Sequence, residues 1–416
     1  MRILFLTQWF EPEPAFKGAD FAAALEARGH EVEVATGLPN YPGGKLYPGY
    51  RIRPYQRQAV DGIVTHRLAL WPSHNSSAPG RIANYLSFFI STLLFGLVRG
   101  GRYDLVYVYH PPVTPSAAAA IFCALHRKPL VVEIQDLWPD SVAASGMAGK
   151  SITRVLGALC TFVYRRATMI VPQSDRMLAR LRERGVPARK LQRIYNWATY
   201  CRRAGAALPE RTEDAFLDRF NVVYGGNLGQ AQALDGLIDA VALAGEGVPS
   251  LHLHLFGNGI ERERLAAHAE RVAPSRVTLH GPLDRRVMDR VFDRADALAV
   301  QLKDDPLYAI TIPSKVQHYL ACGRPILAGL TGEAAELLRR AGAALVCPPG
   351  DAEALAEAIR QLAEMPAAER ARMGENGRRF YEAELGFDRA IDETLGVMQE
   401  AARRYGVNPR QQAGAG

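Results

Sequence analysis

The amino-acid sequence predicts an α/β fold with two domains, each built around a parallel sheet. The chain has 416 residues, which is too long for one ordinary core. Short apolar stretches typical of buried strands alternate with helical patterns from Ile3 to Thr36, and the same alternation begins again at Asn221. Between Tyr200 and about Phe220 the periodicity disappears and arginine, alanine and proline become frequent, as expected for an interdomain linker.

These observations set the expected domain boundaries. We expect a first α/β domain over residues 1–200, a linker over 201–220 and a second α/β domain over 221–383. A C-terminal helix is expected from residue 384, followed by a flexible tail. In such folds the loop of each strand–helix unit leaves the carboxyl edge of the sheet, which is where ligands bind.

The composition is that of a soluble globular protein, with 48% apolar and 22% charged residues. The net charge of +7 and the isoelectric point near 9.2 suit an anionic partner, such as nucleic acid, a sugar nucleotide or an anionic membrane surface. Arginine is dispersed, and no ribbon of aromatic and basic residues is found, so nucleic acid is the least favoured of the three.

The cysteines and the N-terminus indicate a cytoplasmic protein. The apolar part of Met1–Thr7 is too short for a signal peptide and indicates a first strand. The five cysteines are widely spaced and form no Cys-x-x-Cys pair, so we expect reduced core thiols instead of disulfides or metal ligands; they are Cys123, Cys160, Cys201, Cys322 and Cys347.

The clearest candidate ligand site lies in the second half of the chain. Ala297–Leu302 is an apolar run suited to a buried strand, Pro313 indicates a first helical turn, and Gly323 ends that helix. A helix start presents free N–H groups and the positive end of the helix dipole, here with Lys315 in the first turn. These features predict a phosphate or diphosphate site. The alternative is a capped surface helix with a solvated lysine.

Glycine-rich turns support the same site. The strand Asn221–Tyr224 runs into Gly225–Gln232, where backbone amides can approach a diphosphate closely. The Gly-x-Gly-x-x-Gly fingerprint is absent, so a nicotinamide site is not indicated. Because each loop follows the carboxyl end of a strand, we expect the loops to surround one crevice lined by Gly226, Gly257, Lys315 and Glu333.

In the first domain, two loops carry candidate residues. Lys17 and Gly18 follow the first strand and lie at the carboxyl edge of the expected sheet. Asp136 follows the strand Leu130–Ile134, where a carboxylate can meet a substrate hydroxyl, although it could equally be a loop cap. Asp140, before Ser141, is expected to cap a helix.

The most apolar helix candidate spans Ile82 to Val98, with basic residues on both sides. At 17 residues it barely reaches spanning length, so we expect a buried or interfacial helix. Either it rests on an anionic leaflet, with Phe88 and Phe89 as the lipid-facing side chains, or it is a core helix that covers the sheet.

Two further stretches are less informative. Gly37–Tyr50 is a long loop, which indicates function or disorder, and its three tyrosines argue against disorder. His252 and His254 share one face of the strand Leu251–Phe256. Nothing nearby in the sequence resembles a metal shell, so we interpret both as ordinary strand histidines.

Several motifs, in this order, resemble the donor half of family 4 retaining glycosyltransferases. They are Gly225–Gly229, Gly257–Gly259, His280–Pro282, Ile312–Ile326, Gly332–Glu333 and Pro348–Asp351. The similarity is closest to the bacterial surface-polysaccharide branch that includes the L-fucosamine transferases of O-antigen synthesis, which Gly29–Val34, Pro39–Pro42 and Asp136–Asp140 also resemble. The resemblance implies a GT-B fold, in which two Rossmann-like domains face each other across a cleft, with acceptor in the first and nucleotide sugar in the second. It also implies that the C-terminal helix from residue 384 packs back on the first domain.

The sequence also departs from the family pattern. Ile310 and His318 stand where many members carry two glutamates, Asn227 and Gln232 where many carry a basic pair, and Gln135 where many carry a histidine. The phosphate charge must then be met by Lys315, helix N-termini and backbone amides, with His318 as a candidate ribose contact. The polysaccharide branch shares such losses, so we interpret them as a subtype.

The resemblance implies transfer of an N-acetylated hexosamine or deoxyhexosamine from a UDP-sugar to a polyprenyl-diphosphate-linked glycan. The enzyme is expected to need no metal and to lie peripherally on the cytoplasmic face of the inner membrane. Two alternatives stay open, a sugar-nucleotide 2-epimerase and a non-catalytic sugar-nucleotide-binding subunit. The expected catalytic residues are Asp136, Lys315, Lys17 and Gly18; the expected donor-binding residues are Gly226, Asn227, Gln232, Gly257, Asn258, Ser314, Lys315, His318 and Glu333.

Overall fold

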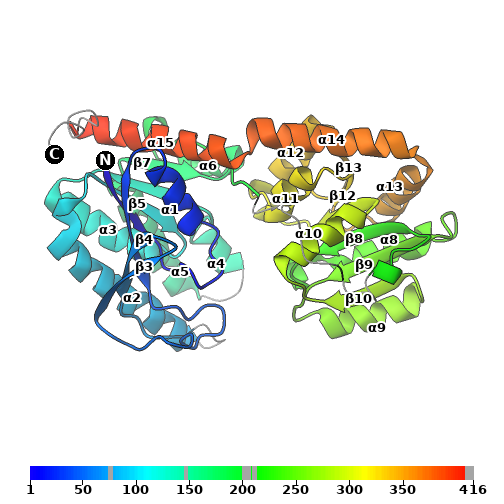
Figure 1. Cartoon of the computed structure of the whole chain (residues 1–416), viewed down its shortest axis with the longest axis horizontal. Coiled ribbons are helices and arrows are strands. Elements are labelled where there is room, and N and C mark those ends of the chain that lie inside the picture. Colours follow the sequence, from blue (N-terminus) through cyan, green and yellow to red (C-terminus); the bar gives the residue numbers. More distant parts are fainter. Residues whose placement is uncertain (74–77, 145–148, 199–207, 209–212, 408–416) are drawn as a thin grey trace. The chain divides into compact units, whose positions relative to one another are not determined.

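The computed structural model describes residues 1–73, 78–144, 149–198, 208 and 213–407. It divides the chain into two compact units, one of Met1–Tyr195 with Asp388–Gly416 and the other of Asn196–Phe387 (Figure 1). Cys201, most of the expected linker and the expected C-terminal tail lie outside the described residues.

The first unit is built around a seven-stranded sheet in the order β3-β4-β2-β1-β5-β6-β7. Neighbouring strands are parallel except for β3 and β4, which form an antiparallel hairpin at one edge. The strand order reverses direction between β1 and β5, which marks the expected ligand crevice of this unit. The strands are β1 (Arg2–Leu6), β2 (Glu31–Gly37), β3 (Tyr55–Val60), β4 (Ile63–Leu68), β5 (Leu105–His110), β6 (Leu130–Ile134) and β7 (Met169–Pro172).

Helices flank this sheet. Among them α3 packs against both α2 and α5, so these three form one layer. The two helices α2 and α3 approach closely at Gly96 of α2, where a Cβ atom would lie 2.0 Å from the Phe122 ring of α3. The helices are α1 (Ala19–Glu26), α2 (Ala78–Arg99), α3 (Val113–His126), α4 (Asp140–Ala144), α5 (Lys150–Arg166), α6 (Asp175–Glu183) and α15 (Phe387–Arg404), with short 3₁₀ turns η1 (Gly100–Arg102) and η2 (Ala188–Lys190).

The C-terminal helix α15 belongs to the first unit. Arg28, just after α1, donates to Asp392 at 2.6 Å and to Asp388 at 3.1 Å. Exposed ion pairs of this kind contribute little stability each. The apolar side chains of α15, including Ile391 and Met398, are buried, and their burial provides the larger part of the attachment.

The second unit contains a six-stranded sheet, with every neighbouring pair parallel, in the order β10-β9-β8-β11-β12-β13. This is the doubly wound order of a Rossmann fold, and its direction reverses between β8 and β11. The loops after these two strands therefore border the expected crevice. The strands are β8 (Phe220–Gly225), β9 (Leu251–Phe256), β10 (Val277–Gly281), β11 (Ala297–Gln301), β12 (Ile326–Gly329) and β13 (Ala344–Cys347).

The helices of the second unit cover this sheet, with α8 and α13 packed on each other over a buried apolar cluster. They are α8 (Leu234–Ala244), α9 (Arg262–Val272), α10 (Arg285–Arg294), α11 (Ser314–Cys322), α12 (Gly332–Ala341), α13 (Ala352–Glu364) and α14 (Ala367–Glu384), with 3₁₀ turns η3 (Gln230–Gln232) and η4 (Tyr308–Ile310). As expected, Gly323 ends α11 in the left-handed region, with φ of 70°.

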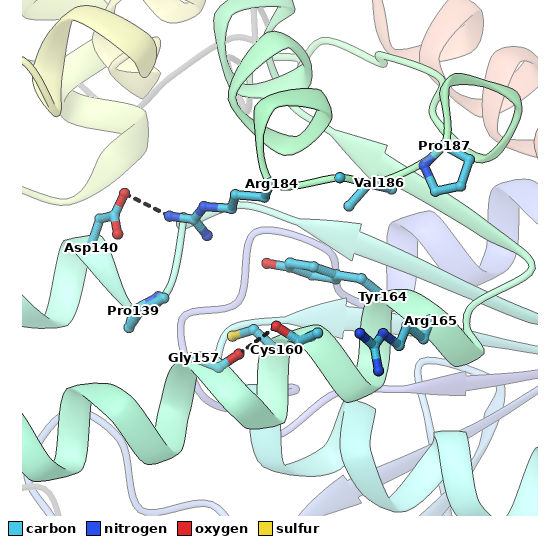
Figure 2. Close-up of a pocket in the computed structure, with 11 residues that line it drawn as sticks. Pro139, Asp140, Gly157, Cys160, Tyr164, Arg165, Arg184, Val186 and Pro187 are labelled. Carbon is cyan, nitrogen blue, oxygen red and sulfur yellow. Dashed lines mark hydrogen bonds and ion pairs between the residues drawn. The ribbon is translucent and has the colours of Figure 1, made fainter.

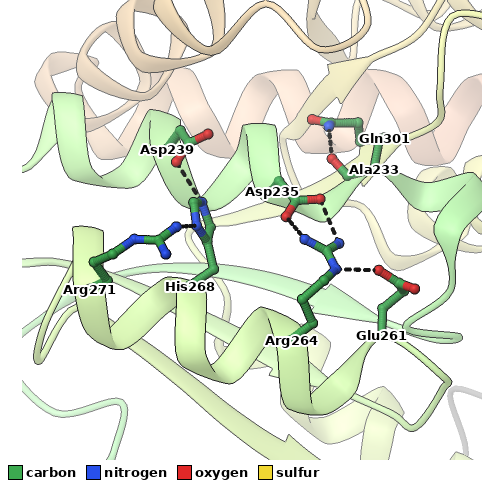
Figure 3. Close-up of polar contacts among 8 residues, drawn as sticks. All are labelled: Ala233, Asp235, Asp239, Glu261, Arg264, His268, Arg271 and Gln301. Atoms are coloured by element: carbon green, nitrogen blue, oxygen red, sulfur yellow. Dashed lines mark hydrogen bonds and ion pairs between the residues drawn. The ribbon is translucent and has the colours of Figure 1, made fainter.

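Polar contacts join α8 to α9 and to the end of β11 (Figure 3). Arg264 bridges Asp235, with one N–O distance of 2.9 Å, and Glu261, at 2.6 Å, while His268 contacts Asp239 at 2.7 Å. Gln301, at the end of β11, donates to the carbonyl of Ala233. These contacts fix the start of α8, and with it the loop that leaves β8.

Helix α2 is partly a core helix. By length and composition alone Pro79–Arg102 could cross a membrane, but one side of α2 is buried in the first unit. Phe88 lies on that side with none of its surface exposed, so the prediction that it faces lipid is wrong. Phe89 is half-buried. The pattern failed here because the large aromatic side chains pack inward, whereas aliphatic side chains occupy the outer face.

Candidate active site

In the second unit, the loops after β8 and β9 are in direct backbone contact. Gly226 and Gly257 have φ angles of +144° and +131°, and a Cβ atom on Gly257 would lie 1.8 Å from the Gly226 carbonyl oxygen. The Gly226 N–H donates to the Phe256 carbonyl at 2.9 Å. Glycine is therefore required at these positions for the two loops to meet.

Lys315 lies in the first turn of α11 and points at this pair of loops. Its ammonium is 4.9 Å from the centre of the Tyr224 ring, and a Cβ atom on Gly226 would lie 2.6 Å from its Nζ atom. Across the described parts of the chain no carboxylate pairs with Lys315. Because the side chain is partly buried without a counter-charge, desolvation lowers its pKa to about 8.

The position of α11 is fixed by two tyrosines. The Gly225 N–H donates to the Tyr319 hydroxyl at 3.0 Å, and the Tyr224 hydroxyl donates to the Asn227 carbonyl at 2.7 Å. Both rings are buried. The start of α11, the glycine loop and the Lys315 ammonium are thus held together, which is the arrangement that binds phosphate at helix N-termini.

The other expected donor residues mostly support the loops. Gln232 accepts from the Gly229 N–H at 3.1 Å, and Asn258 accepts from the Gly259 N–H at 2.9 Å. Asn227 is exposed in the loop, and Ser314 is the exposed first residue of α11. Glu333 is buried in the first turn of α12. The structure thus brings Gly226, Gly257 and Lys315 together, and it gives Gln232 and Asn258 contacts to the loop backbone.

His318 lies one turn further along α11 and contacts α10. Its Nε2 atom is 3.1 Å from a carboxylate oxygen of Asp289, and its ring meets Phe292 edge-on at 5.4 Å. The side chain is 18% exposed. The contact with Asp289 joins α11 to α10, and the sequence did not indicate it.

In the first unit, Lys17 is buried in a polar cluster. Its ammonium pairs with Glu133 of β6 and donates to the Tyr107 hydroxyl at 3.0 Å. Glu133 also accepts from Tyr107 and Gln135. Burial lowers the pKa of Lys17, and the Glu133 carboxylate opposes that shift. With 2% of its surface exposed, Lys17 supports the loops at the sheet edge and does not reach solvent.

Gly18 has a related structural role. It is the residue before α1, and a Cβ atom there would lie 1.8 Å from a carboxylate oxygen of Glu11. The same oxygen accepts from the Ala19 N–H at 3.0 Å. The start of α1 is therefore already occupied by a carboxylate. Gly18 provides the space for Glu11.

Asp136 lies at the carboxyl end of β6, as expected, with its side chain exposed. Within the described ranges its carboxylate accepts no hydrogen bond, so it caps no loop there. Partial desolvation by the surrounding protein raises the pKa of this carboxyl. On the neighbouring strand, His110 is buried, and desolvation lowers its pKa to about 3, so its ring is neutral. Asp136 is thus a free hydrogen-bond acceptor at the sheet edge.

Arg184 holds the loop that carries Asp136. It donates to the Trp138 carbonyl at 2.8 Å. It also pairs with Asp140 at 2.6 Å (Figure 2). Asp140 therefore begins α4 as an ion-pair partner. Beneath this contact is a pocket of about 560 Å³ lined by α5 and the segment after α6. Nothing in the sequence near Arg184 signals this role, because its partners lie 44 and 46 residues earlier.

Glu133 is a second residue that the sequence analysis missed. Its signal is visible in retrospect, because it is the one charged residue in the otherwise apolar run Leu130–Ile134.

Of the residues that the structure describes, no group of three or more His, Cys, Asp or Glu side chains is arranged to hold a metal ion.

Two family models identify the class of protein. Residues 19–197 match the glycosyl transferase 4-like domain and residues 219–365 match the glycosyl transferases group 1 domain. The chain is therefore a glycosyltransferase enzyme with a GT-B fold.

Two curated relatives are similar at low identity. The protein named as colanic acid biosynthesis glycosyl transferase WcaI of Escherichia coli is 26% identical over 361 residues, which covers 82% of this chain and 86% of the relative. The glycosyltransferase WbjE of Pseudomonas aeruginosa is 25% identical over 245 residues, or 56% of this chain and 60% of the relative.

Solved structures agree on the fold. Anabaena HepE in complex with UDP has a TM-score of 0.69 at 17% identity, covering 96% of this chain and all of HepE. WaaG, a glycosyltransferase involved in lipopolysaccharide biosynthesis, has a TM-score of 0.64 at 16% identity, covering 95% of this chain and 99% of WaaG. At these identities the likeness concerns the fold alone.

Proposed function

We propose that this protein is a retaining glycosyltransferase of bacterial surface-polysaccharide synthesis, acting in the O-antigen or capsule pathway. It transfers an N-acetylated hexosamine or deoxyhexosamine from a UDP-sugar to a polyprenyl-diphosphate-linked glycan. The observation that carries the proposal is the Lys315 ammonium, which lies without a carboxylate partner in the described chain against the glycine loop at the start of α11. Such a site accepts a diphosphate.

The relatives support the substrate classes. HepE was solved with UDP and with UDP-glucose, WcaI is named for colanic acid biosynthesis, and WaaG for lipopolysaccharide biosynthesis. In the proposed function the acceptor is carried on a membrane lipid. We therefore place the enzyme on the cytoplasmic face of the inner membrane as a peripheral protein.

The chemistry assigned to the second unit is electrostatic. As the bond between the sugar C1 and the diphosphate breaks, negative charge grows on UDP, and Lys315 and the backbone amides of the glycine loop stabilise it. The acceptor hydroxyl forms the new bond to C1 on the same face and releases its proton to the departing diphosphate. In this proposal Lys315 and the start of α11 neutralise the negative charge of the departing diphosphate, in place of a metal ion.

Asp136 is assigned to the acceptor. Its exposed carboxylate can accept a hydrogen bond from the attacking hydroxyl and so orient the acceptor. Lys17 and Gly18, which were expected to be catalytic, are assigned positioning roles, because one is buried against Glu133 and the other makes room for Glu11. His318 keeps its candidate role as a ribose contact, with Asp289 orienting its ring.

Two other functions make different predictions. A 2-epimerase would isomerise a UDP-sugar without any acceptor, whereas a non-catalytic subunit would bind it and return it unchanged. The second is motivated by Ile310, which stands where the family commonly has a carboxylate. To separate the three, the protein is incubated with a panel of UDP-sugars, with and without membrane lipid extract, while UDP release and sugar isomerisation are followed. We expect UDP release only with the extract.

A further inference from the structure

The outer face of α2 is a continuous apolar stripe. Ile82, Leu86, Ile90, Leu94 and Val98 follow one another at four-residue spacing, and each is between 49% and 81% exposed. Residues four apart lie on one face of a helix. A stripe of this length on a surface helix is typical of a binding face.

The opposite side of α2 fixes the helix to the first unit. Phe88 and Thr92 are fully buried, and Gly96 packs against Phe122 of α3. Asn84, also buried, accepts from Gln8 at 2.6 Å and donates to the Trp71 carbonyl at 2.7 Å. The helix is thus held along its length by the fold, and only its outer face is available to a partner.

The charge of the surrounding helices is one-sided. The layer formed by α2, α3 and α5 contains no aspartate or glutamate. It carries basic residues instead, among them Arg154, Arg165 and Arg166 on α5, while Arg102 follows α2. The other helices of the unit differ, because α1 and α6 carry two acidic residues each and α15 carries four.

We infer that the α2 stripe, which lies on a layer of helices that carry basic and no acidic residues, docks this protein on an anionic lipid bilayer. Apolar side chains on a helix flanked by cations suit the boundary between lipid headgroups and acyl chains. A second copy of the chain fits less well, because the two layers would bring arginines together without any carboxylate to pair them. This inference deepens the proposed function, since it specifies how the enzyme would meet a lipid-linked acceptor.

The test measures vesicle binding of the full chain by flotation, with vesicles of phosphatidylcholine alone or mixed with phosphatidylglycerol. The double variant Ile90→Ser/Leu94→Ser removes two exposed apolar side chains and should reduce binding to the anionic vesicles at least about ten-fold. The matched control, Leu217→Ser/Leu243→Ser, changes two similarly exposed leucines of the second unit and should bind as the parent does. Binding of the parent should weaken in about 0.5 M salt, which screens the arginines.

Circular dichroism and melting temperature keep the test interpretable, because the substituted side chains are exposed and the variant should fold. A folded Ile90→Ser/Leu94→Ser protein that binds anionic vesicles as tightly as the parent would overturn the inference. The inference would also be overturned if the parent does not bind vesicles but forms a dimer that this variant does not form. UDP affinity is measured on the same samples. A parent protein that does not bind UDP would count against the proposed function alone, since vesicle binding does not depend on UDP.

Discussion

Replacing Lys315 with methionine separates a ligand-binding role from a structural one. Methionine keeps most of the volume of the side chain and removes the charge. If the ammonium meets the diphosphate, the variant loses a charge-assisted contact of about 1.5–3 kcal/mol, so UDP affinity should fall by about ten- to a hundred-fold. Calorimetric titration with UDP measures this loss directly.

The same substitution should stabilise the free protein at neutral pH. The folded pKa of Lys315 is about 8, against an ordinary value of 10.5. Burial of the charged form therefore lowers the free energy of unfolding, and this penalty is fully present below pH 8. The penalty decreases as pH rises from 8 to 10.5. At about 1.36 kcal/mol per pKa unit, the upper limit of the gain for Lys315→Met is roughly 3 kcal/mol. A structural lysine would give the opposite sign.

The pH dependence of UDP binding supplies a third readout. UDP affinity of the parent should decline above about pH 8, where the free protein loses the proton of Lys315, and Lys315→Met should lack this decline. Lys45→Ala, in an exposed loop of the first unit, is the control for general loss of a lysine. Unchanged UDP affinity in Lys315→Met, or a lower melting temperature at pH 7, would refute the reasoning.

Three further substitutions test other parts of the site. Asp136→Asn should slow transfer at least about ten-fold, one step of 1.4 kcal/mol, with UDP affinity and melting temperature unaltered; full activity would remove Asp136 from the mechanism. Lys17→Met leaves Glu133 buried and unpaired, so urea unfolding should show a loss of about 3–5 kcal/mol, which adding Glu133→Gln should partly restore; if the single variant is as stable as the parent, the pair is not structural. Gly257→Ala should abolish UDP binding, because its Cβ would overlap the Gly226 carbonyl; normal binding would show that the loop contact is dispensable.

Much of the fold follows from local patterns in the sequence. The buried strands are short apolar runs, and Pro313 and Gly323 bracket α11 through their backbone preferences. The hairpin of β3 and β4 was not expected, because β3 is an edge strand whose Tyr55–Val60 residues are mostly polar, with three of the six exposed. Edge strands carry a weak hydrophobic signal.

The candidate site was only partly predictable. Gly226, Gly257 and Lys315 could be grouped because parallel strands bring their loops to one edge. The partners of Lys17 could not be found, since Tyr107 and Glu133 lie 90 and 116 residues away. For α2, the sequence indicated an apolar helix with basic flanks, but which side chains face outward depends on its packing against α3.

The central claim is glycosyl transfer from a UDP-sugar to a lipid-linked glycan. The most direct measurement follows UDP release and the masses of the extracted lipids in one reaction of purified protein, UDP-sugar and membrane lipid extract. The account predicts that a lipid species gains the mass of a single sugar residue, with one UDP released for each sugar transferred. Release of free sugar, isomerisation of the UDP-sugar without lipid, or binding with no turnover on any lipid fraction would contradict it.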